Sequence, residues 1–149
     1  MHRNLSKIIY LIVCFVFFLF SDLYLSNLLV REINSGLNIN NGVFALNYIK
    51  NTGAAFSILR DSREFLIILS CVAIVLLFLY VFKHIKSISM KSIFFVSLLT
   101  SGIAGNLHER IVFGYVRDFF ELTFVNISDI FINIGVIALI ILILLKKTK

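Results

Sequence analysis

Charged residues are scarce in this chain, at 15% of 149 residues, whereas hydrophobic residues make up 60%. With a mean hydropathy of +1.00, this composition excludes a soluble globular domain. The chain is also too short for two domains. We therefore expect one integral membrane domain over residues 1–149.

Cysteine is nearly absent, with two residues in the whole chain. Cys14 and Cys71 each lie inside an apolar run, where a thiol usually acts as a small hydrophobic group. A nucleophilic thiolate needs an electropositive and accessible setting, which neither run offers. The sequence thus favours neither a disulfide nor a catalytic cysteine.

Several enzyme signatures are missing as well. The sequence contains no Gly-rich phosphate loop and no HExxH, GxSG or CxxC pattern. His108 has no metal-ligand partner at a recognisable spacing. We therefore expect no metal and no cofactor, and carboxylates remain as the candidate chemistry.

Four long apolar runs dominate what is present. A helix needs about 20 apolar residues to cross the hydrocarbon core of a bilayer, and four runs meet or approach this length. They predict a membrane all-α fold, a bundle of four transmembrane helices over residues 8–30, 65–82, 92–107 and 127–145. The first run is longer than a signal-peptide core and lacks a small-residue cleavage site, so we expect it to be a retained helix.

The net charge of +6 reflects membrane topology and does not indicate nucleic-acid binding. Lysine and arginine lie before the first run, in the link between the second and third runs, and after the last run. The positive-inside rule places both termini and that link in the cytoplasm. The other loops carry balanced charge, so they are expected to face outward.

The first outer segment has its own pattern. Residues 39–43 form a turn signal, and residues 44–49 alternate as a half-buried strand would. We therefore expect a small extracytoplasmic β-element at about 37–50. The small residues that follow, at 51–57, allow close approach of backbone to a ligand, although the spacing alone favours a tight loop before a short amphipathic stretch.

A polar cluster lies between the last two apolar runs. Asp118 and Asp129 occur there together with Asn106, Arg110 and Asn126. Ionisable groups close to lipid are costly, so the default hypothesis is a functional site. Asn106 and Arg110 lie four residues apart on one helical face. Asn126 can cap the last helix, with Asp129 in its first turn.

Some of these residues also have a structural interpretation. Arg110 could be an anchor at the outer interface that snorkels to water. Gly105 could serve only close helix packing in lipid. Asp22, near the outer end of the first run, is either a residue at the water interface or an inward carboxylate that supports the site.

Four blocks together resemble the signature of a known family. The blocks Asn51-Thr-Gly-Ala-Ala-Phe-Ser57, Gly105-Asn106…Arg110, Val116-x-Asp118-Phe119 and Asn126-x-x-Asp129 resemble those of lipoprotein signal peptidase, or signal peptidase II. The resemblance implies an intramembrane aspartyl endopeptidase of the bacterial inner membrane. Such an enzyme removes the signal peptide of a diacylglyceryl-modified prolipoprotein before its lipidated cysteine, and globomycin inhibits it. The implied fold is four helices with a small β-cradle on the outer face, next to the outer leaflet.

The resemblance also implies roles for individual residues. Asp118 and Asp129 fall on the catalytic pair; the helix N-terminus next to Asp129 favours its charged form and so suggests Asp129 as the base, but the sequence leaves this assignment open. The substrate-binding positions are Asn51, Asn106, Arg110 and Asn126. The supporting positions are Asp22, Gly53, Gly105 and Glu109, where Glu109 is expected to support Arg110 or a nearby backbone amide. The expected partners are prolipoprotein substrates and membrane lipid, and we expect a monomer that binds no nucleic acid.

This chain departs from the family at four positions. The family usually has Lys at Ser26, Gly at Ser101, Asp at Glu109 and Ala at Ser128. Two other functions remain open: a small proton- or cation-conducting membrane protein, and a relative that binds lipoproteins without cutting them. The clustering of the carboxylates at one face disfavours conduction, and the retained pair of aspartates disfavours the second alternative.

Overall fold

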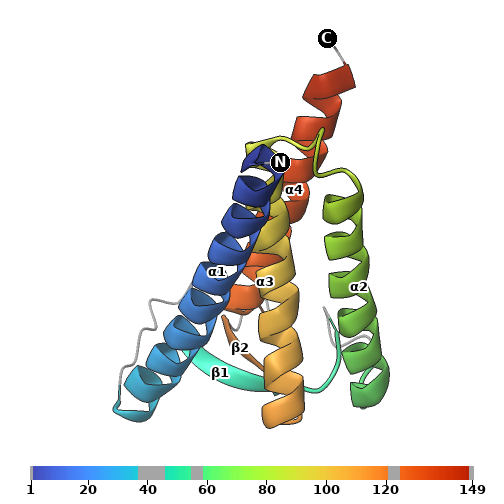
Figure 1. The fold of residues 1–149 in the computed structure, drawn as a ribbon. Helices are drawn as coiled ribbons and strands as arrows, with labels where there is room; N and C mark the ends of the chain where they lie inside the picture. Colours follow the sequence, from blue (N-terminus) through green and yellow to red (C-terminus); the bar gives the residue numbers. More distant parts are fainter. Residues whose placement is uncertain (1, 37–45, 55–58, 121–124, 148–149) are drawn as a thin grey trace.

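The computed structural model describes residues 2–36, 46–54, 59–120 and 125–147 (Figure 1). They form, in order, α1 (His2–Asn34), β1 (Leu46–Asn51), α2 (Arg63–Lys83), α3 (Met90–Val112), β2 (Val116–Phe120) and α4 (Ile127–Lys147). All four helices are long and apolar enough to cross a membrane. The predicted four-helix membrane bundle with a small β-element is therefore confirmed.

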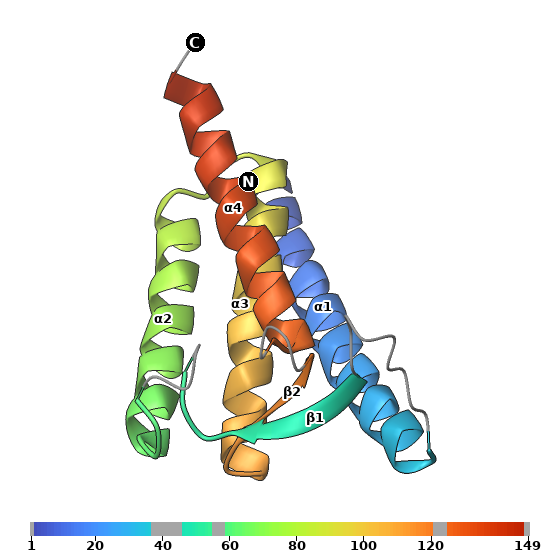
Figure 2. The same cartoon turned by 180° about the vertical axis from the view of Figure 1, so that it is seen from behind.

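α3 is the central helix of the bundle. It packs against α1, α2 and α4 (Figures 1 and 2). In its most apolar window 56% of the residues are buried, against 11–17% in the other three helices. Three buried hydroxyl groups on α3 donate to carbonyl oxygens of the same helix, from Ser97, Thr100 and Ser101. Protein therefore surrounds much of this least apolar helix, and this lets it carry polar residues to the site.

α3 also extends beyond its predicted end at residue 107, as far as Val112. Glu109 and Arg110 at its end are buried, so the charges that appeared to terminate the span are part of the helix. Arg63 at the start of α2 closes this end, because its guanidinium donates to the carbonyl oxygens of Arg110 at 2.9 Å and Ile111 at 3.1 Å.

Glycines allow α3 and α4 to approach closely. A Cβ atom at Gly102 would collide with the carbonyl oxygen of Ser128. At Gly135, a Cβ atom would lie 2.8–3.1 Å from Cβ, N and Cα of Leu99. Such distances to backbone leave no room for a side chain, and small residues commonly permit this packing between membrane helices. The close approach brings the first turn of α4 against α3, where the site lies.

The two strands pair antiparallel at one end of the bundle, here called the sheet end. Ile49 pairs with Asp118, Lys50 with Arg117 and Asn51 with Val116. The predicted element at about 37–50 is observed from Leu46 onward, and residues 37–45 with their turn signal lie outside the described residues. β2 was not predicted, because its strand partner lies far away in the sequence and no hairpin turn joins them.

The opposite end of the bundle holds the start of α1, the end of α4 and the link between α2 and α3 (Figure 1). Lys7 is buried there, and its ammonium group donates to the carbonyl oxygens of Ile85 at 2.9 Å, Lys86 at 3.3 Å and Ile88 at 2.7 Å. Next to it lies the apolar core cluster of Leu11, Val81, Ile93 and Val96. The lysine that marks topology in the sequence thus also joins α1 to the α2–α3 link.

Candidate active site

Asn126 connects the two aspartates. Its side-chain amide donates to Oδ1 of Asp118 on β2 and to Oδ2 of Asp129 on α4, both at 3.0 Å. Its Oδ1 accepts the backbone N–H of Asp129 at 2.8 Å, the geometry of a helix N-cap. The predicted cap is therefore present, and the same residue holds the two carboxylates on either side of one amide group.

Asn51 holds the other oxygen of Asp118. Its amide donates to Asp118 Oδ2 at 2.9 Å and to the carbonyl of Ala54 at 3.3 Å. Its Oδ1 accepts the backbone N–H of Gly53 at 2.8 Å, so the chain folds back on itself after β1. An asparagine side chain that bonds its own backbone two residues on is a common turn-forming device. The strand pairing and this turn together bring Asn51 to Asp118.

α3 supplies the groups that contact Asp129 and the turn. Asn106 donates to Asp129 Oδ1 at 2.8 Å. Arg110 donates to the backbone oxygen of Asn106 at 3.3 Å and to that of Gly53 at 2.9 Å. Arg110 is only 9% exposed, so its interpretation as a snorkelling interface anchor is wrong. Gly53 acts here as a carbonyl acceptor that ties the turn to the helix.

Two buried polar atoms in this group have no hydrogen-bond partner within the described parts of the chain: Oδ1 of Asn106 and Nε of Arg110. Their parent residues, Asn106 and Arg110, line the same cavity of about 250 Å³ as Asp129. Its remaining walls come from α2, α3, α4 and the turn after β1, through Ala54, Leu66, Leu69, Ser70, Ala73, Ile103 and Ile132. A mostly apolar cavity with a few convergent polar groups is typical of a ligand site.

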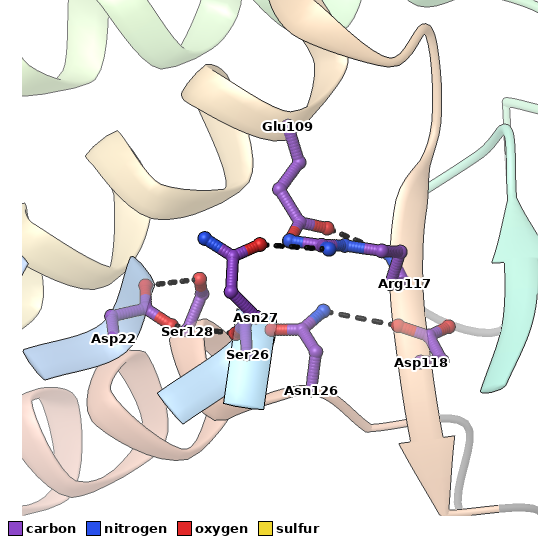
Figure 3. A network of polar contacts seen from close by, with 8 residues as sticks. All are labelled: Asp22, Ser26, Asn27, Glu109, Arg117, Asp118, Asn126 and Ser128. Carbon is purple, nitrogen blue, oxygen red and sulfur yellow. Dashed lines mark hydrogen bonds and ion pairs between the residues drawn. The ribbon is translucent and has the colours of Figure 1, made fainter. Parts of the chain in front are cut away.

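Asp22 lies behind the pair, on α1. It is 1% exposed, so it does not lie at the water interface. Ser128 donates to its Oδ2 at 2.5 Å and Ser26 to its Oδ1 at 3.4 Å (Figure 3). Position 105 faces this carboxylate, and a Cβ atom there would collide with it. Gly105 therefore makes room for Asp22, which supports α4 next to Asp129.

Glu109 forms the second support, from α3. Its carboxylate accepts the backbone N–H of Arg117 at 2.7 Å and the Arg117 guanidinium at 2.5 and 2.8 Å (Figure 3). The expected contact with a backbone amide is thus present, and its cationic partner is Arg117 instead of Arg110. Arg117 was missed by the sequence reasoning, because it occupies the unspecified position between Val116 and Asp118.

The electrostatics of Asp118 suit acid–base chemistry. Burial raises the pKa of Asp118 above its ordinary value, and the nearby carboxylates of Asp129 and Glu109 raise it further. Hydrogen bonds from the two asparagine side chains oppose the increase. Two carboxylates this close do not easily ionise together, so the pair can share one proton. One carboxylate can then act as a base while the other donates a proton.

Metal ligation has no comparable support. Over the residues that the structure describes, no group of three or more His, Cys, Asp or Glu side chains could hold a metal ion. The side chains that donate hydrogen bonds to Asp118 and Asp129 are the amides of Asn51, Asn106 and Asn126, which would compete with a cation for the carboxylate oxygens.

Comparison with known proteins identifies the family. Residues 12–145 match the family described as "Signal peptidase (SPase) II". The chain belongs to the signal peptidase II family. It is therefore an aspartic endopeptidase, and the resemblance that four short sequence blocks predicted is confirmed. The family match does not favour the ion-conducting and non-cleaving alternatives.

Curated relatives and solved structures agree with this. The chain is 40% identical over 115 residues to the lipoprotein signal peptidase of Caldicellulosiruptor bescii, covering 75% of each chain. It is 36% identical over 116 residues to that of Streptococcus thermophilus, covering 74% of this chain and 75% of the relative. A bacterial membrane enzyme solved by the in meso method at 2.3 Å resolution superimposes with a TM-score of 0.73 at 28% identity, covering 93% of this chain and 89% of that one.

Proposed function

We propose that this chain removes the signal peptide from diacylglyceryl-modified prolipoproteins, cutting before the lipidated cysteine, with Asp118 and Asp129 as its catalytic pair. The observation that carries the proposal is the Asn126 amide, which donates to one oxygen of each carboxylate. Further support comes from relatives that are named lipoprotein signal peptidases.

The mechanism follows from the two carboxylates. Asp129 lies in the first turn of α4, where the helix N-terminus stabilises negative charge, so it acts as the base. It takes a proton from water as the water oxygen attacks the scissile carbonyl carbon. Asp118, whose pKa is raised, donates its proton to the carbonyl oxygen. On collapse of the tetrahedral intermediate, Asp129 returns the proton to the leaving nitrogen and Asp118 regains its own.

Two atoms that have no hydrogen-bond partner among the described residues are suited to hold the substrate backbone. Oδ1 of Asn106 can accept from a peptide N–H, and Nε of Arg110 can donate to a peptide carbonyl. In the apolar cavity beside them, such bonds form away from competing water. The substrate side chains next to the scissile bond would then occupy the cavity between α2, α3 and α4.

We propose further that the sheet end lies at the outer leaflet of a bacterial inner membrane, with both termini in the cytoplasm. Lysines concentrate at the opposite end, as Lys83, Lys86, Lys91 and Lys146. The substrate is held in the bilayer by its acyl chains, so the site needs only to lie at their level. A single domain that works as a monomer is sufficient for this reaction.

The test is direct cleavage. The purified protein in lipid nanodiscs is incubated with a diacylglyceryl-modified prolipoprotein, and mass spectrometry detects the shortened product that begins at the lipidated cysteine. Asp118→Asn serves as the inactive control, because an amide cannot donate and regain the proton. Absence of product with the wild-type protein, or full activity of Asp118→Asn, contradicts the proposal.

A further inference from the structure

We propose that Arg117 is a positioning residue that holds Asp118 in place for catalysis, acting through Glu109 on α3 and Asn27 on α1. The inference rests on the proposed role of Asp118 in prolipoprotein cleavage. Neither the family signature nor the acid–base chemistry assigns any role to Arg117.

The contacts of Arg117 form a clamp between β2 and two helices. Nε and Nη2 donate to Oε1 of Glu109 at 2.8 and 2.5 Å, and the backbone N–H donates to Oε2 at 2.7 Å. Nη1 donates to Oδ1 of Asn27 at 3.1 Å (Figure 3). The guanidinium also lies 4.6 Å from the ring centroid of Phe113, in the turn before β2. One buried side chain, 6% exposed, thus joins α1, α3 and β2.

β2 needs such an anchor. The sheet has only two described strands, and its register is irregular between Leu46 and Ile49. A two-stranded ribbon alone is marginally stable in water, so pairing with β1 does not by itself fix the position of Asp118. The turn before β2 contains Gly114 at φ +84°. Because glycine is the residue with the greatest backbone freedom, this turn does little to fix the position of β2. The clamp connects β2 directly to α1 and α3.

The position of the clamp explains why it acts on Asp118. Successive side chains of a strand point to opposite faces, so Arg117 fastens the face of β2 that lies away from the dyad. The side chains of Arg117 and Asp118 are both buried, so β2 is held by contacts on both of its faces. Asn51 and Asn126 hold the carboxylate of Asp118 itself, while Arg117 holds the backbone that carries it.

A substitution of Arg117 or Glu109 alone would not separate a loss of positioning from a loss of fold stability. Removing one member of a buried ion pair leaves the other charge uncompensated, which destabilises the fold by itself. The test therefore removes both charges together, with Arg117→Met and Glu109→Gln in one protein. The glutamine side chain can still accept the backbone N–H of residue 117, and the methionine fills most of the arginine volume.

The readout is kcat and KM for cleavage of a diacylglyceryl-modified prolipoprotein in nanodiscs, normalised to the folded fraction from thermal unfolding. A misplacement of about 1 Å costs roughly 100-fold in rate, so we expect kcat of the double variant to fall by about that factor. KM should stay near the wild-type value, because Asn106, Arg110 and the cavity are untouched. The single variant Arg117→Lys, with Glu109 kept, should have a kcat between those of the double variant and the wild type. Its ammonium group keeps the positive charge next to Glu109 but cannot make the forked contact of a guanidinium.

Lys50→Met is the matched control. Lys50 is the β1 residue paired with Arg117, it is exposed, and its ammonium lies 4.9 Å from the ring centroid of Tyr115. The substitution Lys50→Met removes a cation from the same strand pair and leaves the contacts of Arg117 with Glu109 and Asn27 intact, so kcat should be unchanged. Wild-type kcat in the folded double variant overturns the inference, and so does an equal loss in Lys50→Met. An inactive wild-type protein, or an active Asp118→Asn, would instead overturn the proposed function.

Discussion

Ser128 donates a hydrogen bond of 2.5 Å to the carboxylate of Asp22, which lies 106 positions earlier in the chain. The bond joins the first turn of α4 to α1 directly beside Asp129. Within the described residues, Asp22 accepts its other hydroxyl hydrogen bond from Ser26, at 3.4 Å. The serine of α4 is therefore the main neutral partner of a carboxylate that is almost fully buried.

The first prediction concerns this bond. Ser128→Ala should lower the free energy of unfolding by about 1 to 3 kcal/mol, because a buried acceptor loses its closest donor. Thermal unfolding in detergent measures the change. Ser21→Ala is the control, since among the described residues the Ser21 hydroxyl donates to the carbonyl of Phe17 on its own helix. Equal stability of the Ser128 and Ser21 variants would show that Asp22 does not depend on Ser128.

The second prediction concerns the dyad. Asp118→Asn and Asp129→Asn should each abolish cleavage, while the protein still unfolds at nearly the wild-type temperature. Groups that act as a unit are not additive, so the double variant should be hardly slower than either single variant. Single-turnover rates measure this. A double variant that is slower by the product of the two single effects would show that the aspartates act separately.

The third prediction concerns pH. Burial raises the pKa of Asp118, so its proton is retained at a higher pH than in a free aspartate. Because the acid must be protonated, activity should fall as the pH rises through this raised pKa of the coupled pair. Asn51→Ala removes a hydrogen bond that lowers the pKa of Asp118, so the alkaline limb of the kcat profile should move to higher pH.

Lys50→Met is the control for the pH profile, because it removes a charge from the neighbouring position without affecting a hydrogen bond of Asp118. Its alkaline limb should coincide with that of the wild type. A limb that moves to lower pH in Asn51→Ala would mean that the group controlling the profile is not Asp118.

The fourth prediction concerns orientation. In a protein with Cys14→Ser and Cys71→Ser, single cysteines at Ser35 and Ser62 should react with a membrane-impermeant maleimide in intact cells. A cysteine at Ser87 should react only after the cells are opened. Ser35 and Ser87 are exposed at opposite ends of the bundle, so each reports one side of the membrane. The reverse pattern would place the dyad in the cytoplasm.

The helices could be predicted from the sequence because a membrane span requires a long apolar run. Their ends could not, since charged residues that are buried resemble charged residues that end a span. Glu109 and Arg110 illustrate this: they lie within α3 and face protein, where Glu109 pairs with Arg117 and Arg110 donates to the carbonyl oxygen of Gly53. Local composition does not distinguish these two environments.

The proposed catalytic carboxylates were predictable, because ionised Asp118 and Asp129 side chains are energetically costly near lipid and both fall in recognisable sequence blocks. β2 and Arg117 were not. A short strand with two charged residues shows no apolar alternation, and its pairing with β1 is non-local. Only the assembled fold reveals that Arg117 meets Glu109 and Asn27, residues on two other elements.

Lys7 sets an order of events during biosynthesis. Its three carbonyl acceptors lie 78, 79 and 81 positions further along the chain, at Ile85, Lys86 and Ile88. At a synthesis rate of about 5–20 residues per second, they follow Lys7 out of the ribosome after roughly 4 to 16 seconds. During that interval the ammonium group of Lys7 has none of these acceptors. The end of the bundle far from the site therefore closes late, when the ammonium group of Lys7 reaches its three carbonyl oxygens.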